Sequence, residues 1–364
     1  MYAKISKFVN IEEYCANFES DLNKDEKAKS FWSKQILILI DNFVKQIRSI
    51  EEETDDDNKD NKNHETKEEK IIKFKTEYQA KVNKLMEDPT KFLSIRQLLQ
   101  LNEELLKKYE FGDIWRYHKL EENRKALSLL ENRLQQVATN NTYSRFETLF
   151  YGLLSANIFD SGATAVQKIL KENKNFNFGD AMLKVQKRPW LVDNFDSFMD
   201  VLLQGKIKCI TFFADNCGID LCLGVLPLIV EFLKLDIKVI LCANSGPSLN
   251  DITINELINV IETAGEFCDL IKSSYENRNL ILCENGQYGC CLNFLEINET
   301  LLDLMISMEV DLIVIEGVGR SIHSNFNAKF KCQSLKLAVI KNNFLAEGLG
   351  GKIFDAICKF ECYK

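Results

Sequence analysis

An aspartate and an asparagine stand next to each other where a strongly apolar segment ends. The segment KCITFFADNCGID (residues 208–220) runs through apolar and weakly polar residues to Asp215 and Asn216, then to Gly218 and Asp220. Adjacent side chains on a regular strand point to opposite faces, so Asp215 and Asn216 share a ligand only where the strand ends in a loop. Gly218 permits that break, because glycine tolerates unusual backbone angles. The pattern fits either a tight turn or a bound metal ion.

Oxygen-bearing and cationic residues also follow three later apolar segments. They are Asp251 in SGPSLNDIT (245–253), Glu316 and Arg320 in EGVGR (316–320), and Lys341 at the end of LKLAVIK (335–341). Asp215, Asn216 and Asp251 form an all-oxygen ligand set. Hard divalent ions such as Mg²⁺ or Mn²⁺ prefer such ligands and leave positions open for water and phosphate oxygens. These residues therefore predict a divalent-metal site.

The same segments also carry the features that a phosphate group requires. Arg320 and Lys341 provide positive charge and hydrogen-bond donors. Gly317 and Gly319, beside Glu316, let backbone amides approach an anion, and a helix that begins after residue 253 would direct its positive end to the same edge. Each motif alone is also ordinary turn or capping chemistry. Their common position after apolar segments favours a binding site.

Short apolar segments alternate with helical patterns in the second half of the chain. The expected strands are KIKCITFFA (206–214), IKVILCA (237–243), RNLILC (278–283), VDLIVIE (310–316) and LKLAVIK (335–341). Helical periodicity separates several of them, at residues 221–235, 252–265 and 298–308. Alternation of this kind predicts an α/β fold with a doubly wound, mostly parallel sheet. Ligands in such folds bind beyond the carboxyl ends of the strands.

The first part of the chain predicts a helical domain. Residues 31–47, 92–109 and 125–137 have apolar side chains at the three- and four-residue spacing of amphipathic helices. A nearly uninterrupted charged and amide-rich stretch at about 51–69 cannot bury enough apolar surface to order itself, so we expect a flexible insertion. We expect a helical domain over 1–140 and an α/β metal-binding domain over 141–364.

Composition narrows the class of protein. The formal net charge of −8 disfavours nucleic acid as a partner. The sequence has no apolar stretch long enough to span a membrane and no signal-peptide pattern at its start, which favours a cytoplasmic protein. The 12 cysteines lie largely in apolar segments and the chain has only 3 histidines, so we expect reduced thiols and no zinc site. The composition is compatible with a homo-oligomer.

The motifs together resemble the metal-dependent damage-control phosphatases, a former domain-of-unknown-function family. The resemblance runs from EENRKALSLLEN through SANIFDSGA and KRPWLVDNFDSF to LGGKIFDAICKF, covering about residues 120–364. Its most specific elements are DNxGxD, the run P-S-x-N-D-x-T, and EGVGR in place of the EGMGR motif. This motif indicates the branch that stands alone in plants and is fused to a pantothenate-kinase-like domain in animals.

The resemblance implies roles for individual residues. The metal ligands of the family match Asp215, Asn216 and Asp251. An Asn-x-x-Asp segment of the family matches Asn157 and Asp160, which implies contact with the substrate or its phosphate.

The catalytic set would be Asp215, Asp251 and Lys341, with Lys341 also a phosphate ligand. The residues Glu316, Gly317, Gly319 and Arg320 of EGVGR would contact the substrate. Members of the family hydrolyse phosphate monoesters with Mn²⁺, Co²⁺, Ni²⁺ or Mg²⁺. The implied substrates are 4′-phosphopantetheine and its oxidised or otherwise damaged forms. The nucleophile is either water or an aspartate, with Asp160, Asp220 and Asp251 equally eligible as base or nucleophile.

Two other functions fit parts of the pattern. A doubly wound sheet with acidic strand ends also serves carboxyl methyltransferases, although the sequence has no GxGxxG turn after its first strand. A non-catalytic metal- or ligand-binding module would keep the same ligand residues. Metal dependence separates phosphate hydrolysis from methyl transfer, and turnover separates an enzyme from a binding module.

Overall fold

The computed structural model describes residues 1–50, 65–138, 141–160, 166, 168–169, 172–173 and 175–363. The helical elements before the sheet are α1 (Tyr2–Ile5), α2 (Ile11–Asn17), η1 (Leu22–Lys24), α3 (Glu26–Ser49), α4 (Lys67–Glu87), α5 (Ile95–Lys108), α6 (Arg116–Leu127), α7 (Leu130–Gln136), α8 (Thr142–Ala156) and α10 (Phe178–Lys184). They are followed by β1 (Val192–Asp193), α11 (Phe195–Leu203), β2 (Cys209–Phe213), η2 (Asp220–Val225), α12 (Leu226–Lys234), β3 (Lys238–Ala243), α13 (Ile254–Phe267), α14 (Asp269–Glu276), β4 (Leu280–Glu284), η3 (Phe294–Glu296), α15 (Glu299–Ser307), β5 (Leu312–Glu316), η4 (Val318–His323), β6 (Gln333–Val339), α16 (Asn343–Leu349) and β7 (Ala356–Glu361).

The chain divides into two compact units. One comprises Met1–Glu19 with His118–Lys364, and the other comprises Ser20–Tyr117. The sequence-based boundary after residue 140 lies at a different position from this division and stays a prediction.

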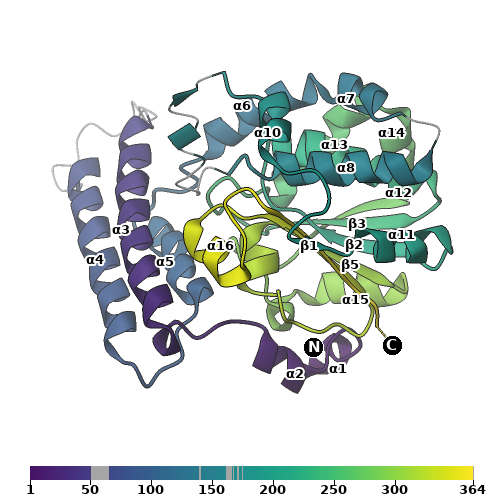
Figure 1. Cartoon of the computed structure of the whole chain (residues 1–364). Helices are drawn as coiled ribbons and strands as arrows, with labels where there is room; N and C mark the ends of the chain where they lie inside the picture. Colours follow the sequence, from purple (N-terminus) through teal and green to yellow (C-terminus); the bar gives the residue numbers. More distant parts are fainter. Residues whose placement is uncertain are drawn as a thin grey trace. The chain divides into compact units, whose positions relative to one another are not determined.

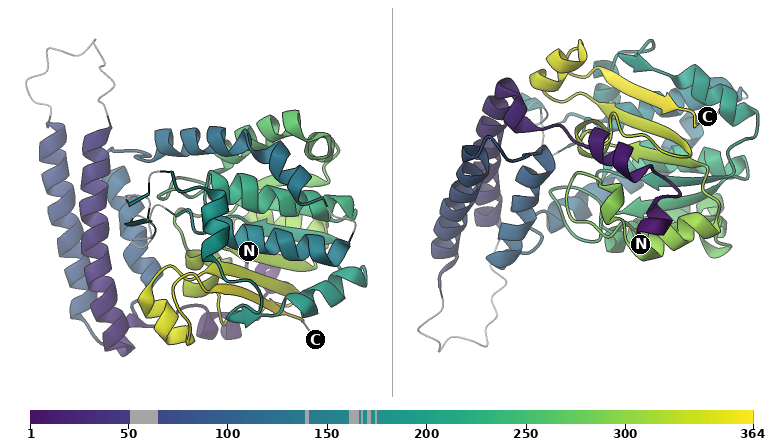
Figure 2. Two further views of the ribbon diagram at one scale, coloured as in Figure 1. Left: turned by 45° about the horizontal axis from the view of Figure 1, so that its top comes forward. Right: turned by 90° about the horizontal axis from the view of Figure 1, so that it is seen from below.

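The unit Ser20–Tyr117 is built from three long helices, α3, α4 and α5, of which α3 and α4 lie side by side (Figure 2). Side chains cap each start: Asp25 for α3, and Thr66 and Ser94, each within a capping box, for α4 and α5. The helical patterns predicted at residues 31–47 and 92–109 are thereby confirmed. Most of the predicted charged insertion, residues 51–64, lies outside the described residues, and its last residues begin α4.

A seven-stranded sheet organises the other unit, in the order β1-β7-β6-β5-β2-β3-β4. All neighbouring pairs are parallel except β6 and β7, which are antiparallel. The five strands expected from the sequence correspond to β2, β3, β4, β5 and β6, so the predicted mostly parallel α/β sheet is confirmed. The sequence analysis did not predict β1 or β7.

The two faces of the sheet carry separate apolar cores. Alternate residues of a strand point to opposite faces; in β2, Ile210 and Phe212 join one core while Cys209 and Phe213 join the other. Helices α8, α12 and α13 cover the first face, and α15 with α1 covers the second (Figure 1). Both central strands, β2 and β5, are therefore fully buried.

The order of the strands reverses between β2 and β5. From β2 the chain moves outward to β3 and β4, and then returns to add β5 and β6 on the other side of β2. Doubly wound sheets bind ligands at such a switch point, beyond the carboxyl ends of the strands. A π-helical turn follows each strand there, η2 after β2 and η4 after β5, and such turns occur frequently at functional sites.

Two further expectations concern the whole described chain. All 12 cysteines of the sequence are described, and each is a free thiol. Among the described residues, no helix combines the length and apolar character that crossing a membrane demands.

Candidate metal and phosphate site

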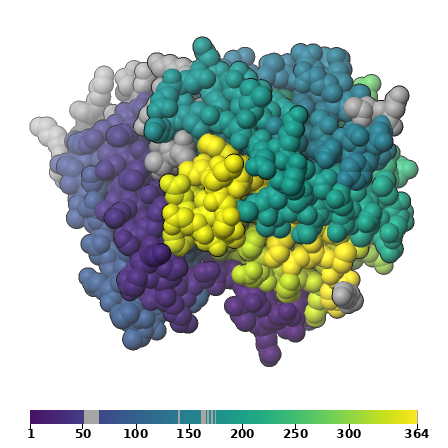
Figure 3. All heavy atoms as spheres, viewed as in Figure 1, coloured from purple at the N-terminus to yellow at the C-terminus, as the bar shows by residue number. Residues whose placement is uncertain are grey.

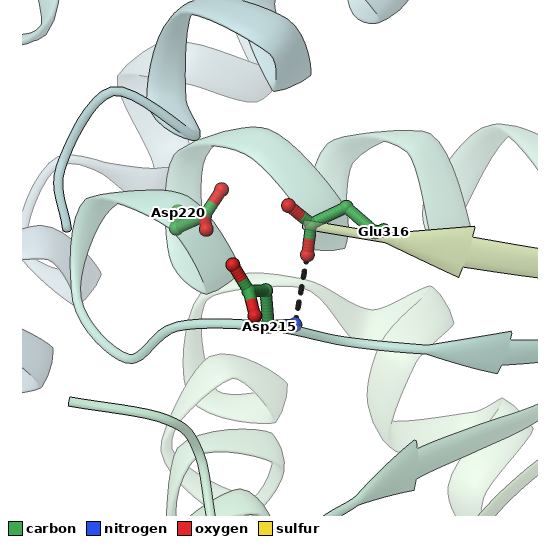
Figure 4. A group of neighbouring side chains, drawn as sticks. All are labelled: Asp215, Asp220 and Glu316. Atoms are coloured by element: carbon green, nitrogen blue, oxygen red, sulfur yellow. Dashed lines mark hydrogen bonds between the residues drawn. The ribbon is translucent and has the colours of Figure 1, made fainter. Parts of the chain in front are cut away.

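Three buried carboxylates meet at the switch point. Asp215 follows β2, Glu316 ends β5, and Asp220 begins the turn η2. Figure 4 shows their side chains pointing toward one another, and one oxygen of each lies within 4.8 Å of the others. Glu316 Oε2 also accepts a hydrogen bond of 2.8 Å from the backbone N–H of Asp215, which ties the two strand ends together. This acidic cluster (Asp215, Asp220 and Glu316) is the centre of the site.

Asn157, at the carboxyl end of α8, binds the acidic cluster from the helical side. Its side-chain amide donates to Asp220 Oδ2 at 3.0 Å, to Asp215 Oδ2 at 3.3 Å and to Glu316 Oε1. Its amide oxygen accepts from the backbone N–H of Val339, at 3.4 Å. Asn157 is fully buried, and its contacts hold the three carboxylates at fixed positions.

The loop after β2 is fixed by both side-chain and backbone contacts. The Asn216 side chain donates to Asp215 Oδ2 and to Asp220 Oδ2, each at 2.8 Å. An isolated antiparallel bridge joins Asn216 to Asp251, so the two predicted ligand segments run beside each other. The backbone N–H of Gly218, at φ +70°, donates to Asn123 Oδ1 of α6 at 2.6 Å. The loop is therefore braced from α6 as well as from the sheet.

Arg320 lies between two of the predicted metal ligands. Its guanidinium donates to Asp215 Oδ1 and, at 2.8 Å, to Asp251 Oδ2. It also donates to Asn244 Oδ1 at 3.0 Å, while the Asn244 amide donates to Asp251 Oδ2 at 3.1 Å. Arg320 is fully buried, so its charge faces these partners rather than bulk solvent.

The glycines of EGVGR allow this close packing. A Cβ atom at Gly317, which has φ +96°, would lie 2.2 Å from Asp215 Cγ. One at Gly319 would lie 2.1 Å from the carbonyl oxygen of Cys290. The Gly317 N–H donates to Leu337 O at 2.9 Å, so it belongs to the sheet contacts. Both positions require glycine for steric reasons.

Lys341 and Asp160 form an ion pair near the cluster, with Lys341 Nζ 2.9 Å from Asp160 Oδ2. The Lys341 side chain is buried, and that of Asp160 is partly accessible. Burial alone would lower the pKa of Lys341, but Asp160, Asp215 and Asp220 together raise it above its ordinary value. Lys341 therefore stays a cation at the edge of the acidic cluster.

Negative groups outnumber positive ones at this site. Five carboxylates gather within it, against the two cations Arg320 and Lys341; they are Asp160, Asp215, Asp220, Asp251 and Glu316. Burial raises the pKa of Asp220 to about 7, and the neighbouring Asp215 adds to the rise. Burial also raises the pKa of Asp251 to about 7, although Arg320 opposes it. The excess of buried negative charge is costly unless a cation balances it.

The residues present fit a divalent cation. One oxygen of Asp220, Oδ1, is buried and has no hydrogen-bond partner among the described residues. A buried carboxylate oxygen without a hydrogen-bond donor destabilises the folded protein, but such an oxygen is an ordinary metal ligand. All the ligand atoms that the acidic cluster offers are oxygens, as hard ions such as Mg²⁺ and Mn²⁺ prefer.

The structure brings together every residue that the sequence analysis singled out for the site. Some contributions were not foreseen. Asp220 was considered only as a base or nucleophile and Glu316 only as a substrate contact, yet both join Asp215 in the acidic cluster. Asn244 and Asn123 also hold site residues in place. The signal for Glu316 was present, because it ends a fully buried strand and a glutamate is rarely buried without a charged partner.

Fold and site together define a class: an α/β protein with an acidic, oxygen-lined site at the switch point of a doubly wound sheet. The sequence profile of the damage-control phosphatase ARMT1-like domain matches residues 15–357. A plant relative, damage-control phosphatase At2g17340 of Arabidopsis thaliana, is 32% identical over 72% of this chain and 71% of its own length. The chain belongs to the ARMT1-like damage-control phosphatase family.

Longer relatives and a solved structure agree with this assignment. A Mus musculus protein named 4′-phosphopantetheine phosphatase is 32% identical over 94% of this chain and 46% of its own length. Pantothenate kinase 2 of Arabidopsis thaliana is 34% identical over 79% of this chain and 35% of its own length. The chain thus spans about half or less of these two relatives. A DUF89 family protein from Pyrococcus horikoshii shares the fold, with a TM-score of 0.61 at 13% identity, covering 91% of this chain and 97% of that one.

Proposed function

We propose that this chain is a metal-dependent phosphatase that hydrolyses small phosphate monoesters. The observation that carries the proposal is the excess of buried carboxylates over cations at the switch point, with one carboxylate oxygen of Asp220 left without a donor among the described residues. Membership of a damage-control phosphatase family supports the reaction. The similarity to the protein named 4′-phosphopantetheine phosphatase supports 4′-phosphopantetheine, with its oxidised or damaged forms, as substrate.

We propose Asp215 as the central metal ligand, because it belongs to both sets of residues that point to a metal. The sequence motif adds Asn216 and Asp251, and the acidic cluster adds Asp220 and Glu316. The ion would be Mn²⁺, Co²⁺, Ni²⁺ or Mg²⁺. When bound, such an ion supplies Lewis-acid polarisation of a phosphoryl oxygen.

The cations of the site would bind and neutralise the phosphate. Lys341 at the cluster edge and Arg320 beside Asp251 provide donors for the phosphate oxygens and balance the charge that develops on them during transfer. Asn157 orients the carboxylates, and Asp160 holds the Lys341 ammonium at 2.9 Å. The nucleophile is either water or an aspartate.

The charge of the chain indicates the class of partner. With a net charge of −8, the chain would repel nucleic acid and anionic membrane surfaces, so we propose a small phosphorylated metabolite as partner. We place the protein in the cytoplasm, where thiols stay reduced, because its cysteines are all free.

The test is phosphate release by metal-stripped protein. An aryl phosphate and 4′-phosphopantetheine would be offered with Mn²⁺, Co²⁺, Ni²⁺ and Mg²⁺ added back singly. Asp215→Asn would be compared with Asp200→Asn, which removes an exposed carboxylate of α11. We expect metal-restored release that Asp215→Asn abolishes and Asp200→Asn retains. Bound metal without release from either substrate would contradict the enzymatic assignment and favour a binding module.

A further inference from the structure

Two loops that carry candidate metal ligands pair with each other as a short antiparallel ribbon. The backbone N–H of Ile252 donates to Asp215 O at 3.0 Å, and that of Cys217 donates to Asn250 O at 2.9 Å. The isolated bridge between the ligand positions lies between these two hydrogen bonds. The ribbon therefore sets how far apart the two ligand-bearing loops lie. We call it the ligand ribbon (residues 215–217 and 250–252).

Helix α6 holds the first loop just beyond the ligand ribbon. The buried side chains of this helix are Lys119, Asn123, Ala126 and Leu127, so half of them are polar. Lys119 and Asn123 lie four residues apart, which places them on one face of the helix. The Asn123 amide oxygen accepts from the backbone N–H of Gly218 at 2.6 Å. The polar face of α6 therefore fixes the chain where it leaves the ligand ribbon.

Glu256, on α13, joins the second loop to α6. Its Oε2 accepts from the backbone N–H of Thr253 at 2.9 Å and from the Thr253 hydroxyl at 2.7 Å, directly after the ligand ribbon. The other carboxylate oxygen, Oε1, forms an ion pair with Lys119 Nζ at 2.8 Å. Cys217 Sγ, in the first loop, lies 3.8 Å from Oε2. Glu256 thus contacts both loops and α6.

Capping of α13 alone does not explain the burial of this ion pair. The Lys119 side chain is fully buried, and that of Glu256 is 12% exposed. The corresponding capping glutamate of α4, Glu69, bonds to Thr66 in the same way from an exposed position. Burial of both charges costs free energy that capping does not require. The pair is therefore a candidate for a role at the ligand ribbon.

We infer that Lys119, Asn123 and Glu256 are positioning residues, which hold the two loops of the ligand ribbon at the separation that a divalent cation requires. The inference rests on the proposed metal site. Asn123 acts through the Gly218 N–H, and Lys119 acts through Glu256 on Thr253. Residues that orient metal ligands typically change the metal affinity by about 10–100-fold when they are replaced.

Calorimetric titration of the metal-stripped full chain with Mn²⁺ tests the inference. Lys119→Met removes the ammonium that fixes Glu256, and it should raise the dissociation constant for Mn²⁺ by about 10–100-fold. Asn123→Leu leaves no buried charge without a partner, so it should fold even where Lys119→Met does not, and it should raise the same constant. The matched control is Lys336→Met in β6, because Lys336 is equally buried and pairs with Glu361 at 2.6 Å. The control should leave the Mn²⁺ affinity within about twofold.

Hydrogen exchange of the metal-free chain tests the ligand ribbon separately from the ion. The amides of the ribbon should exchange faster in Lys119→Met and Asn123→Leu than in the natural chain, and at the natural rate in Lys336→Met.

Three results would overturn the positioning role while leaving the proposed metal site intact. They are natural Mn²⁺ affinity in folded Lys119→Met and Asn123→Leu, unchanged exchange of the ligand ribbon in both variants, and an equal loss of affinity in Lys336→Met. A natural chain that binds no Mn²⁺ would instead overturn the proposed metal site, and this inference with it.

Discussion

The helical unit Ser20–Tyr117 and the site at the ends of β2 and β5 both carry many charges. The charges of the helical unit are exposed, whereas those of the site are buried. In the helical unit, pairs such as Lys75–Asp41 lie at 2.7 Å with side chains 42% and 55% exposed. At the switch point, the Arg320–Asp251 pair lies at 2.8 Å with side chains 1% and 3% exposed. Exposed pairs contribute little to stability, whereas buried charges are costly to leave without a partner. The exposed charges therefore serve solubility, whereas the buried charges of the site are kept for chemistry.

The comparison predicts that Arg320 is the charge whose loss costs most stability. Arg320→Met would leave Asp215 and Asp251 buried without their shared cation, so the free energy of unfolding should fall by about 3–5 kcal/mol. Urea denaturation measures it. The control Arg124→Met removes an exposed pair with Glu121 and should cost no more than about 1 kcal/mol. Equal losses in the two variants would remove the distinction between buried and exposed charge.

Lys341 should matter strongly for turnover. Lys341→Met removes a donor that would stabilise the transferring phosphoryl group, so the rate of phosphate release should fall on the order of 10²–10³-fold. Steady-state kinetics on an aryl phosphate measures the loss. The exposed Lys352 supplies the control, since Lys352→Met should leave the rate within about twofold. A Lys341→Met enzyme of normal rate would contradict the phosphate-binding role.

Gly317→Ala tests whether the glycines serve close packing around Asp215. The added Cβ would lie 2.2 Å from Asp215 Cγ at a backbone φ of +96°, so the free energy of unfolding should fall by about 1–3 kcal/mol. Thermal and urea unfolding measure the change. Gly348, with no atom within 4 Å of an added Cβ, is the matched position in α16, a helix exposed on the face seen in Figure 3. Gly348→Ala should be neutral or slightly stabilising, and a similar loss there would defeat the steric explanation.

The smallest effect is expected in the helical unit. Lys75→Ala breaks the exposed pair with Asp41, and the free energy of unfolding should change by less than about 0.5 kcal/mol. High salt should reduce this small value further, because it screens exposed charges. A loss near that of Arg320→Met would show that the exposed network carries stability after all.

The sequence predicted the parts of this molecule that depend on local pattern. Uninterrupted apolar runs identified the five parallel strands, and the side chains at their ends identified Asp215, Asp251 and Lys341 as neighbours. The strand β1 has only two residues, too few for a pattern. The strand β7 was missed although its last four residues, CKFE, alternate between apolar and charged side chains.

The acidic cluster was harder to foresee because it depends on geometry. The turn η2 returns Asp220 to within ligand distance of Asp215 and Glu316, and α8 delivers Asn157 between them. The positions of Asp220 and Asn157 beside the other carboxylates do not follow from residue spacing, because they depend on how η2 and α8 pack on the sheet. The position of Arg320 between Asp215 and Asp251 is likewise a tertiary result.

The most direct test of the central claim is calorimetric titration of the metal-stripped full chain with Mn²⁺, in the absence of substrate. The buried excess of carboxylates predicts saturable binding of the ion to the natural chain and to Asp200→Asn, and loss of that binding when Asp215→Asn and Asp220→Asn are combined. Folding of the double variant would be verified by its unfolding transition. Equal binding by the folded double variant, or no binding by the natural chain, would contradict the assignment of this site to a divalent cation.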